Sequence, residues 1–199
     1  MIENLGKANI EFKIESQLGE GAFWNYKTQE LYWVDIDNKY LHIYNPSLKI
    51  NRTFNTPSKI GTVVPVNKEK VVVALADGIY VFDLAHNRLT LLSNIEHDLI
   101  DNRFNDGKCD PSGRLWVGSM SKMMELNKGS LYMVNHFGEA HKKINDVSIS
   151  NGIVWSLDNK IMYYIDTPTR NIKAYDFDNK VGSISNRKIV LNIPKSMGY

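Results

Sequence analysis

The amino-acid sequence predicts an all-β protein, and three observations favour a β-propeller. Helical periodicity is nearly absent from the 199 residues, and short β-rich runs broken by turn residues recur along the chain. Comparable units open at Gly21, Gly61, Gly107 and Gly152, so that successive units are 40, 46 and 45 residues apart by the difference of these numbers. A repeat of roughly 40–50 residues with four short strands is the pattern of a propeller blade. An irregular β-sandwich is the alternative, but it predicts no fixed period.

The strands are predicted where apolar or alternating residues lie between turn signals. They are expected at residues 31–36, 40–44, 62–65, 71–75, 79–82, 88–92, 115–117, 130–134, 161–165 and 172–177. The segment 102–118 has a polar first half and is interpreted as a loop that carries a site, followed by a strand, a tight turn at residues 110–113 and a second strand at 115–117. The segment 120–128 is the least strand-like part of the chain and is expected to cover one face.

Composition and charge narrow the classes of protein. The chain is 43% hydrophobic and 23% charged with a net charge of +2, which fits one globular domain spanning residues 1–199 and gives no reason to expect nucleic acid or a membrane as partner. Cys109 is the single cysteine, so it is interpreted as a small buried residue without a disulfide. Residues 1–13 lack the apolar core of a signal peptide, and no apolar run reaches the roughly 18–20 residues of a membrane span. A cytoplasmic protein is expected.

The residues beside the four glycines are the candidates for a functional site. In a propeller the first strand of each blade lines the central channel, so residues from distant units should meet at its mouth. These residues are Glu20, Ile60, Asn105 with Asp106, and Asn151. Their carboxylate and amide oxygens suit a hard divalent cation such as Ca²⁺, Mg²⁺ or Mn²⁺, with Zn²⁺ as a further option. The alternative is that Glu-Gly and Asn-Gly are ordinary turns.

Other side chains have simpler interpretations. Arg103 is either a substrate anchor or a structural ion-pair residue. Asp110 and Asp158 precede turns and are expected to cap them. The five histidines show no spacing typical of metal ligands. Four tryptophans recur at similar places in their units and are expected to pack between blades: Trp24, Trp33, Trp116 and Trp155.

Three motifs together carry a resemblance to a known family. They are Gly19-Glu20-Gly21-Ala22-Phe23-Trp24, then Arg103-Phe104-Asn105-Asp106-Gly107-Lys108 followed by Asp110-Pro111 and Gly113-Arg114, then Ile149-Ser150-Asn151-Gly152 followed by Trp155-Ser156-Leu157-Asp158. With Tyr163-Tyr164-Ile165-Asp166, these motifs resemble the SMP-30/gluconolactonase/regucalcin family, and in particular its regucalcin-like branch. The resemblance covers the whole chain.

The resemblance implies a six-bladed propeller that holds one divalent metal ion at the channel mouth and hydrolyses sugar lactones such as gluconolactone. It implies that Glu20 and Asn151 are metal ligands and that Arg103 and Asn105 bind substrate. In such a site the metal polarises the lactone carbonyl and lowers the pKa of a water molecule. The arginine would hold sugar hydroxyls or the developing oxyanion.

Two departures from the family pattern qualify these expectations. Met123 stands where some members carry a glutamate that contacts substrate. The family's third metal ligand, an aspartate in Pro-Asp-Gly that doubles as general base, is expected beyond Tyr199, so no catalytic residue is assigned. About 45 residues per blade gives roughly four blades in this chain.

An incomplete propeller would expose strand edges, so the 199-residue chain is expected to be poorly stable and to lack full lactonase activity. The alternative function is a calcium-binding or regulatory propeller without turnover. A propeller scaffold without any metal is a third option.

Overall fold

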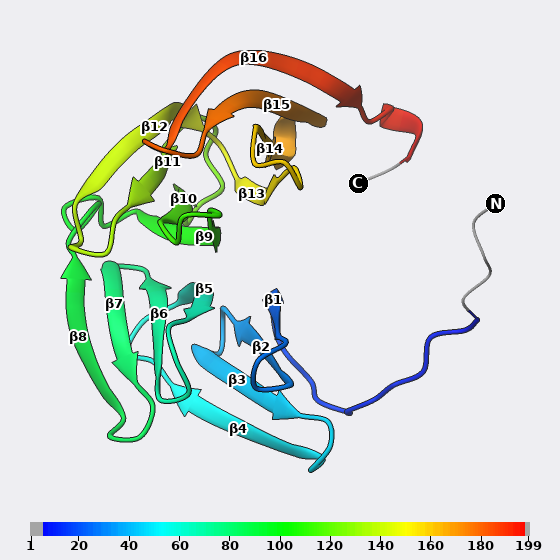
Figure 1. Ribbon diagram of the computed structural model, residues 1–199, viewed down its shortest axis with the longest axis vertical. Coiled ribbons are helices and arrows are strands. Elements are labelled where there is room, and N and C mark those ends of the chain that lie inside the picture. Colours follow the sequence, from blue (N-terminus) through cyan, green and yellow to red (C-terminus); the bar gives the residue numbers. More distant parts are fainter. Residues whose placement is uncertain (1–5, 198–199) are drawn as a thin grey trace.

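The fold consists of four antiparallel sheets of four strands each. The computed structural model describes residues 6–197, so residues 1–5 of the N-terminal segment and the final Gly198 and Tyr199 lie outside the description. In every sheet the strands are adjacent in chain order, from β1–β4 through β13–β16. The sheets stand side by side around a common axis in an open arc (Figure 1). This arrangement of blades confirms the predicted β-propeller.

The strands have the following bounds. The first two sheets contain β1 (Gly19–Asn25), β2 (Glu30–Asp35), β3 (Tyr40–Asn45), β4 (Ile50–Asn55), β5 (Ile60–Pro65), β6 (Lys70–Leu75), β7 (Gly78–Asp83) and β8 (Arg88–Ser93). The other two contain β9 (Asn102–Cys109), β10 (Leu115–Ser121), β11 (Gly129–Val134), β12 (Ala140–Val147), β13 (Ser150–Trp155), β14 (Ile161–Asp166), β15 (Asn171–Asp178) and β16 (Ser183–Asn192). Two 3-10 turns, η1 (Thr167–Thr169) and η2 (Lys195–Met197), are the helical elements of residues 6–197, and neither is long and apolar enough to cross a membrane.

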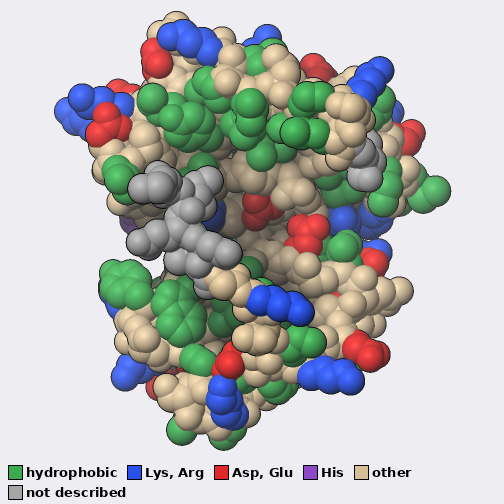
Figure 2. Space-filling model, turned by 90° about the vertical axis from the view of Figure 1, so that its right-hand side faces the viewer, with side chains coloured by type: hydrophobic (Ala, Val, Ile, Leu, Met, Phe, Trp, Pro, Cys, Tyr) green, Lys and Arg blue, Asp and Glu red, His purple; other side chains and the backbone are tan. Residues whose placement is uncertain are grey.

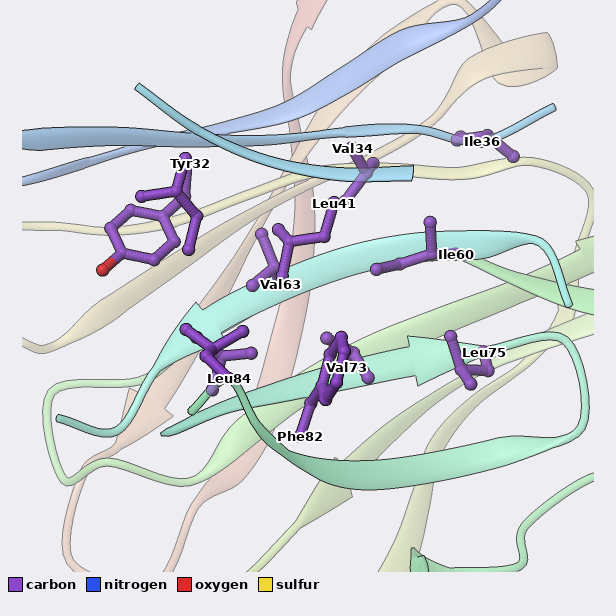
Figure 3. Packing of buried hydrophobic residues seen from close by; sticks show 12 residues of the cluster. Tyr32, Val34, Ile36, Leu41, Ile60, Val63, Val73, Leu75, Phe82 and Leu84 are labelled. Carbon is purple, nitrogen blue, oxygen red and sulfur yellow. The ribbon is translucent and has the colours of Figure 1, made fainter. Parts of the chain in front are cut away.

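Apolar clusters hold neighbouring sheets together. Between the first two sheets, Val34 and Leu41 pack against Ile60, Val63 and Phe82, all 1% exposed or less (Figure 3). A second cluster joins the sheets β5–β8 and β9–β12, and a third joins β9–β12 to β13–β16. Burial of large aliphatic and aromatic side chains contributes about 1.5–3 kcal/mol each, so these interfaces fix the angle between the sheets.

Aromatic residues dominate the third interface. Trp116 is fully buried, and its ring centre lies 6.0 Å from that of Trp155 and 5.9 Å from that of Phe177. The predicted packing role is therefore confirmed for Trp116. Trp24 is different, because 45% of it is exposed and the prediction of a core position is wrong there.

The inner strands β1, β5, β9 and β13 face the common axis and approach each other closely (Figure 1). A Cβ atom on Gly61 would lie 2.4 Å from the carbonyl oxygen of Phe104, and one on Gly118 would lie 1.7 Å from Oγ of Ser150. Such distances are well below van der Waals contact, so only glycine fits at these positions. Gly61 and Gly118 therefore permit the close packing of neighbouring blades.

Each inner strand carries a β-bulge at the same height. The pairing register shifts between Glu20 and Phe23 in β1, across Gly61 in β5, across Asn105 and Asp106 in β9, and across Gly152 in β13. A bulge adds a residue to one strand and changes the direction of nearby side chains. The 40-to-46-residue spacing seen in the sequence is thus the repeat of this bulge.

One prediction about local structure is wrong and another holds in most of its range. The first polar residues of the segment 102–118, interpreted as a site loop, lie in the inner strand β9, where Asn105 donates a hydrogen bond to the carbonyl oxygen of Ser150 in β13. The loop expected at residues 120–128 is found at residues 122–128, whereas Met120 and Ser121 still belong to β10. The expected turn caps are confirmed: Asp110 accepts hydrogen bonds from the backbone of Ser112 and Arg114, and Asp158 accepts one from Lys160.

Candidate functional site

A small cavity lies among the bulges of the inner strands. It has a volume of about 200 Å³ and is lined by Glu20, Gly21, Ala22, Phe23, Val63, Asp106, Gly107, Lys108 and Asn151. Glu20 comes from the first sheet and Asn151 from the fourth, 131 residues further along the chain by the difference of their numbers. Figure 2 looks into the open side of the arc and shows acidic side chains inside its hollow. The structure therefore brings the two sequence-predicted ligands to one place.

Glu20 owes its position to the bulge that follows it. Gly21 adopts φ +63°, a left-handed conformation that favours glycine, and β1 then resumes its pairing at Phe23. Burial raises the pKa of Glu20, the negative charge of Asp106 raises it further, and the guanidinium of Arg103 opposes both. A carboxylate held in this way favours a neighbouring cation, because a cation restores the charged form that burial disfavours.

Asn151 is held by its own bulge. Gly152 has φ +55°, and its N–H donates a 3.1 Å hydrogen bond to Oδ1 of Asn151. The amide nitrogen of Asn151 donates to Oγ1 of Thr167 at 3.5 Å. These contacts orient the carboxamide, and Oδ1 keeps a second lone pair for a ligand.

Arg103 and Asn105 lie beside the cavity and do not line it. Nη1 of Arg103 donates to Oδ1 of Asn105 at 2.7 Å and to the carbonyl oxygen of Phe104 at 3.0 Å. The amide nitrogen of Asn105 donates to the carbonyl oxygen of Ser150 at 2.8 Å, which ties β9 to β13. Both side chains are more than nine-tenths buried. Asn105 therefore orients Arg103, whose side chain is close enough to Glu20 and Asp37 for their charges to act on it.

Ile60 does not join this set. It is fully buried in the cluster between the first two sheets. The second blade therefore has an apolar residue at the position beside its glycine where the other blades have polar ones.

Two aspartates to which the sequence interpretation gave no role hold the backbone next to the site. Asp35 ends β2 and accepts hydrogen bonds from the backbone N–H groups of Gln17 at 3.0 Å and Leu18 at 3.1 Å. Asp166 ends β14 and accepts from Ser148 at 3.2 Å and Ile149 at 2.8 Å. Each carboxylate fixes the chain just before the inner strand of its own sheet. The matched positions after Val34 and Ile165 are a sequence signal that could have found them.

The oxygen donors of the cavity fit a hard divalent cation in kind. Carboxylate and amide oxygens are the ligands that Ca²⁺ and Mg²⁺ prefer. Residues 6–197 contain no group of three His, Cys, Asp or Glu side chains placed to hold a metal ion. Glu20, Asn151 and the cavity residue Asp106 are the donors available to a cation.

Met123 lies outside the cavity lining. It is 78% exposed, directly after β10, and its N–H donates to Oγ of Ser121 at 3.1 Å. Glu125 points elsewhere, since its carboxylate accepts a hydrogen bond from Oγ of Ser121 at 3.2 Å. Met123, which stands where some family members carry a glutamate, therefore places an apolar side chain on the surface of this loop.

The fold and the site together define a class: propeller blades around an axis, with a cavity between the inner strands that is lined by oxygen-bearing side chains. Within that class, the chain belongs to the SMP-30/gluconolactonase/LRE-like family, whose model matches residues 18–199.

Individual relatives agree with this assignment. The chain is 37% identical over 96% of its length to the Bacillus subtilis protein named "Putative sugar lactone lactonase YvrE", and 33% identical over 92% to regucalcin of Xenopus laevis. It covers 65% and 62% of these proteins, so it spans just under two thirds of the curated relatives it matches.

Solved structures agree as well. A luciferin-regenerating enzyme matches with a TM-score of 0.85 and 32% identity, over 96% of this chain and 63% of that one. The calcium-binding protein regucalcin from Agrobacterium tumefaciens matches with a TM-score of 0.87 and 29% identity, over 90% and 61%.

Proposed function

We propose that this chain takes part in the hydrolysis of sugar lactones with the help of one divalent cation held by Glu20 and Asn151. The observation that carries the proposal is the meeting of these two side chains on one cavity, although they come from the first and fourth sheets. The lactonase name of a relative that is 37% identical supports the reaction. The calcium-binding name of a structural neighbour supports the cation.

The chain's own groups have distinct roles in this proposal. A divalent cation, when bound, supplies Lewis acidity toward the lactone carbonyl. Glu20 and Asn151 hold that cation through Oε and Oδ1 atoms. Arg103 uses Nη1 for its protein partners, and its remaining donors would hold sugar hydroxyls or the developing oxyanion of a substrate that reaches it beside the cavity. Asn105 keeps the guanidinium in place through its Oδ1.

The proposal is tested by cation binding and lactone hydrolysis in the same variants. Isothermal titration with Ca²⁺, Mg²⁺, Mn²⁺ and Zn²⁺ should show one site, and Glu20→Gln should weaken it at least about tenfold because a charged ligand is lost. Glu15→Gln, on the exposed N-terminal segment, is the matched control and should bind normally. Gluconolactone opening should follow cation occupancy. Hydrolysis independent of all four cations, or unchanged affinity in Glu20→Gln, would contradict the proposal.

A second candidate is a calcium-binding propeller without turnover. Exposed Met123 favours it, because a methionine cannot hydrogen-bond a sugar at the position where the resemblance places a glutamate. The same assays separate the two functions when they are run on a chain that also contains the expected Pro-Asp-Gly aspartate. Normal cation affinity without hydrolysis of any sugar lactone by that chain would support the second candidate.

A further inference from the structure

Asp106 is the one cavity residue with a carboxylate whose role the family resemblance does not assign. It lies in the bulge of β9, where two residues oppose one of β10. Its carboxylate lines the same cavity as Glu20 and Asn151. Three oxygen-bearing side chains from three different sheets therefore share a volume of about 200 Å³.

The contacts of Asp106 leave most of its capacity free toward the cavity. Its Oδ1 accepts one hydrogen bond, 2.8 Å long, from the N–H of Gly107, and the N–H of Gly152 also lowers its pKa. A carboxylate has about four acceptor positions. Asp110, by contrast, accepts from two backbone N–H groups, an arginine and an indole, which is the pattern of a purely structural carboxylate.

The surroundings of Asp106 disfavour its charged form. Burial raises its pKa, and the nearby Lys108 only partly offsets this effect. Asp106 and Glu20 also repel each other, since the charge of Asp106 raises the pKa of Glu20. Two like charges that share a partly buried cavity are stabilised together by a cation between them.

We propose that Asp106 is a binding residue of the cation site, supplying its second negative charge opposite Glu20. This inference rests on the proposed function, because it concerns the same cation. Asp106 joins Glu20 and Asn151 as the contribution of the third sheet, so three of the four blades take part.

The test compares Ca²⁺ and Tb³⁺ binding to the whole 199-residue chain, with calorimetry for Ca²⁺ and tryptophan-sensitised luminescence for Tb³⁺. Asp106→Asn keeps the shape and one acceptor oxygen but removes the charge. We expect it to weaken Ca²⁺ at least about tenfold and Tb³⁺ by a larger factor, because Coulomb energy scales with the ion's charge. Asp106→Glu keeps the charge and should lose less. Asp101→Asn, on an exposed aspartate of the preceding turn, is the control and should bind normally.

Each outcome decides the inference. Unchanged affinity in Asp106→Asn, with Glu20→Gln impaired, would overturn the role of Asp106 and leave the proposed cation site intact. An equal loss of Ca²⁺ and Tb³⁺ affinity, with a lowered melting temperature, would show a merely structural residue and overturn it as well. Absence of binding by the unsubstituted chain would remove the cation site and this inference with it. If Asp106→Asn does not fold, two other variants replace it: Asp106→Glu keeps the charge and Asp106→Ser removes it. A greater loss of Tb³⁺ than of Ca²⁺ affinity in Asp106→Ser, but not in Asp106→Glu, would support the inference, and equal losses would overturn it.

Discussion

Asp35 shows how a single carboxylate prepares the site without touching it. It is 1% exposed and accepts backbone N–H groups of Gln17 and Leu18, and the side-chain amide of Asn38 at 2.8 Å. Burial by itself would raise the pKa of Asp35, but these donors together lower it. The charged form is thus favoured in the fold, and Leu18 is held two residues before Glu20.

The lowered pKa of Asp35 predicts a specific dependence of stability on pH. Its stabilisation is present above the ordinary carboxylate pKa of about 3.9 and is lost as pH falls through the lower pKa of the folded state. Asp35→Asn should lower the free energy of unfolding at pH 7 by about 1–3 kcal/mol, because charge-assisted hydrogen bonds are lost. Urea unfolding between pH 7 and pH 3 should then show a smaller acid-induced loss than in the unsubstituted chain. Asp101→Asn should leave the profile unchanged, and an unaltered profile for Asp35→Asn would contradict the argument.

At the scale of elements, the middle strands were predictable, whereas the inner strands β1, β9 and β13 and three of the four outer strands were not. Residues 71–75 and 130–134 are apolar runs that become the buried strands β6 and β11. No strand was predicted for β4, β12 or β16, because each outer strand has one neighbour and is largely exposed, so its sequence mixes polar residues without strict alternation.

The candidate site was predictable in its residues but not in its geometry. Glu20 and Asn151 could be paired from the repeat of Glu-Gly and Asn-Gly, because glycine marks the bulge. Asp106 could not be separated from Asn105, since the bulge places two residues opposite one, and the sequence does not indicate which side chain turns inward. Pairing register depends on contacts across strands that no local pattern encodes.

The close approach of β5 and β9 predicts that Gly61→Ala is strongly destabilising. The new Cβ would lie 2.4 Å from the carbonyl oxygen of Phe104 and 2.7 Å from that of Asn105, and these backbone atoms are fixed by the sheet. The strands must separate, at a cost of about 1–3 kcal/mol or more. Gly19→Ala is a milder control, because its Cβ would meet only the side chain of Ser16, with Cβ at 3.2 Å and Oγ at 3.4 Å. Equal melting temperatures for the two variants would contradict close packing at Gly61.

At the scale of the whole molecule, the arc leaves the sheet β13–β16 uncovered on one side. Figure 2 shows hydrophobic side chains along the rim of the hollow on that side. Val154, Val190 and Leu191 are each about half exposed, and an apolar depression of about 430 Å³ includes Ile153, Val154, Tyr163, Ile165, Ile172 and Val190. The three described interfaces between sheets bury faces of the same kind. A face built for sheet packing is therefore open to solvent.

This open face predicts that the 199-residue chain associates with itself and binds the dye ANS, since large exposed apolar patches drive association. Light scattering coupled to size-exclusion chromatography should show species larger than the 22.8 kDa monomer, increasing with concentration. Val190→Asp places a charge in the depression and should reduce both association and dye fluorescence. Val181→Asp is the matched control, because Val181 is an exposed valine of the β15–β16 turn outside the depression. It should change neither the association nor the dye fluorescence. A monodisperse monomer that melts cooperatively and binds no dye would refute the expectation of an incomplete and poorly stable propeller.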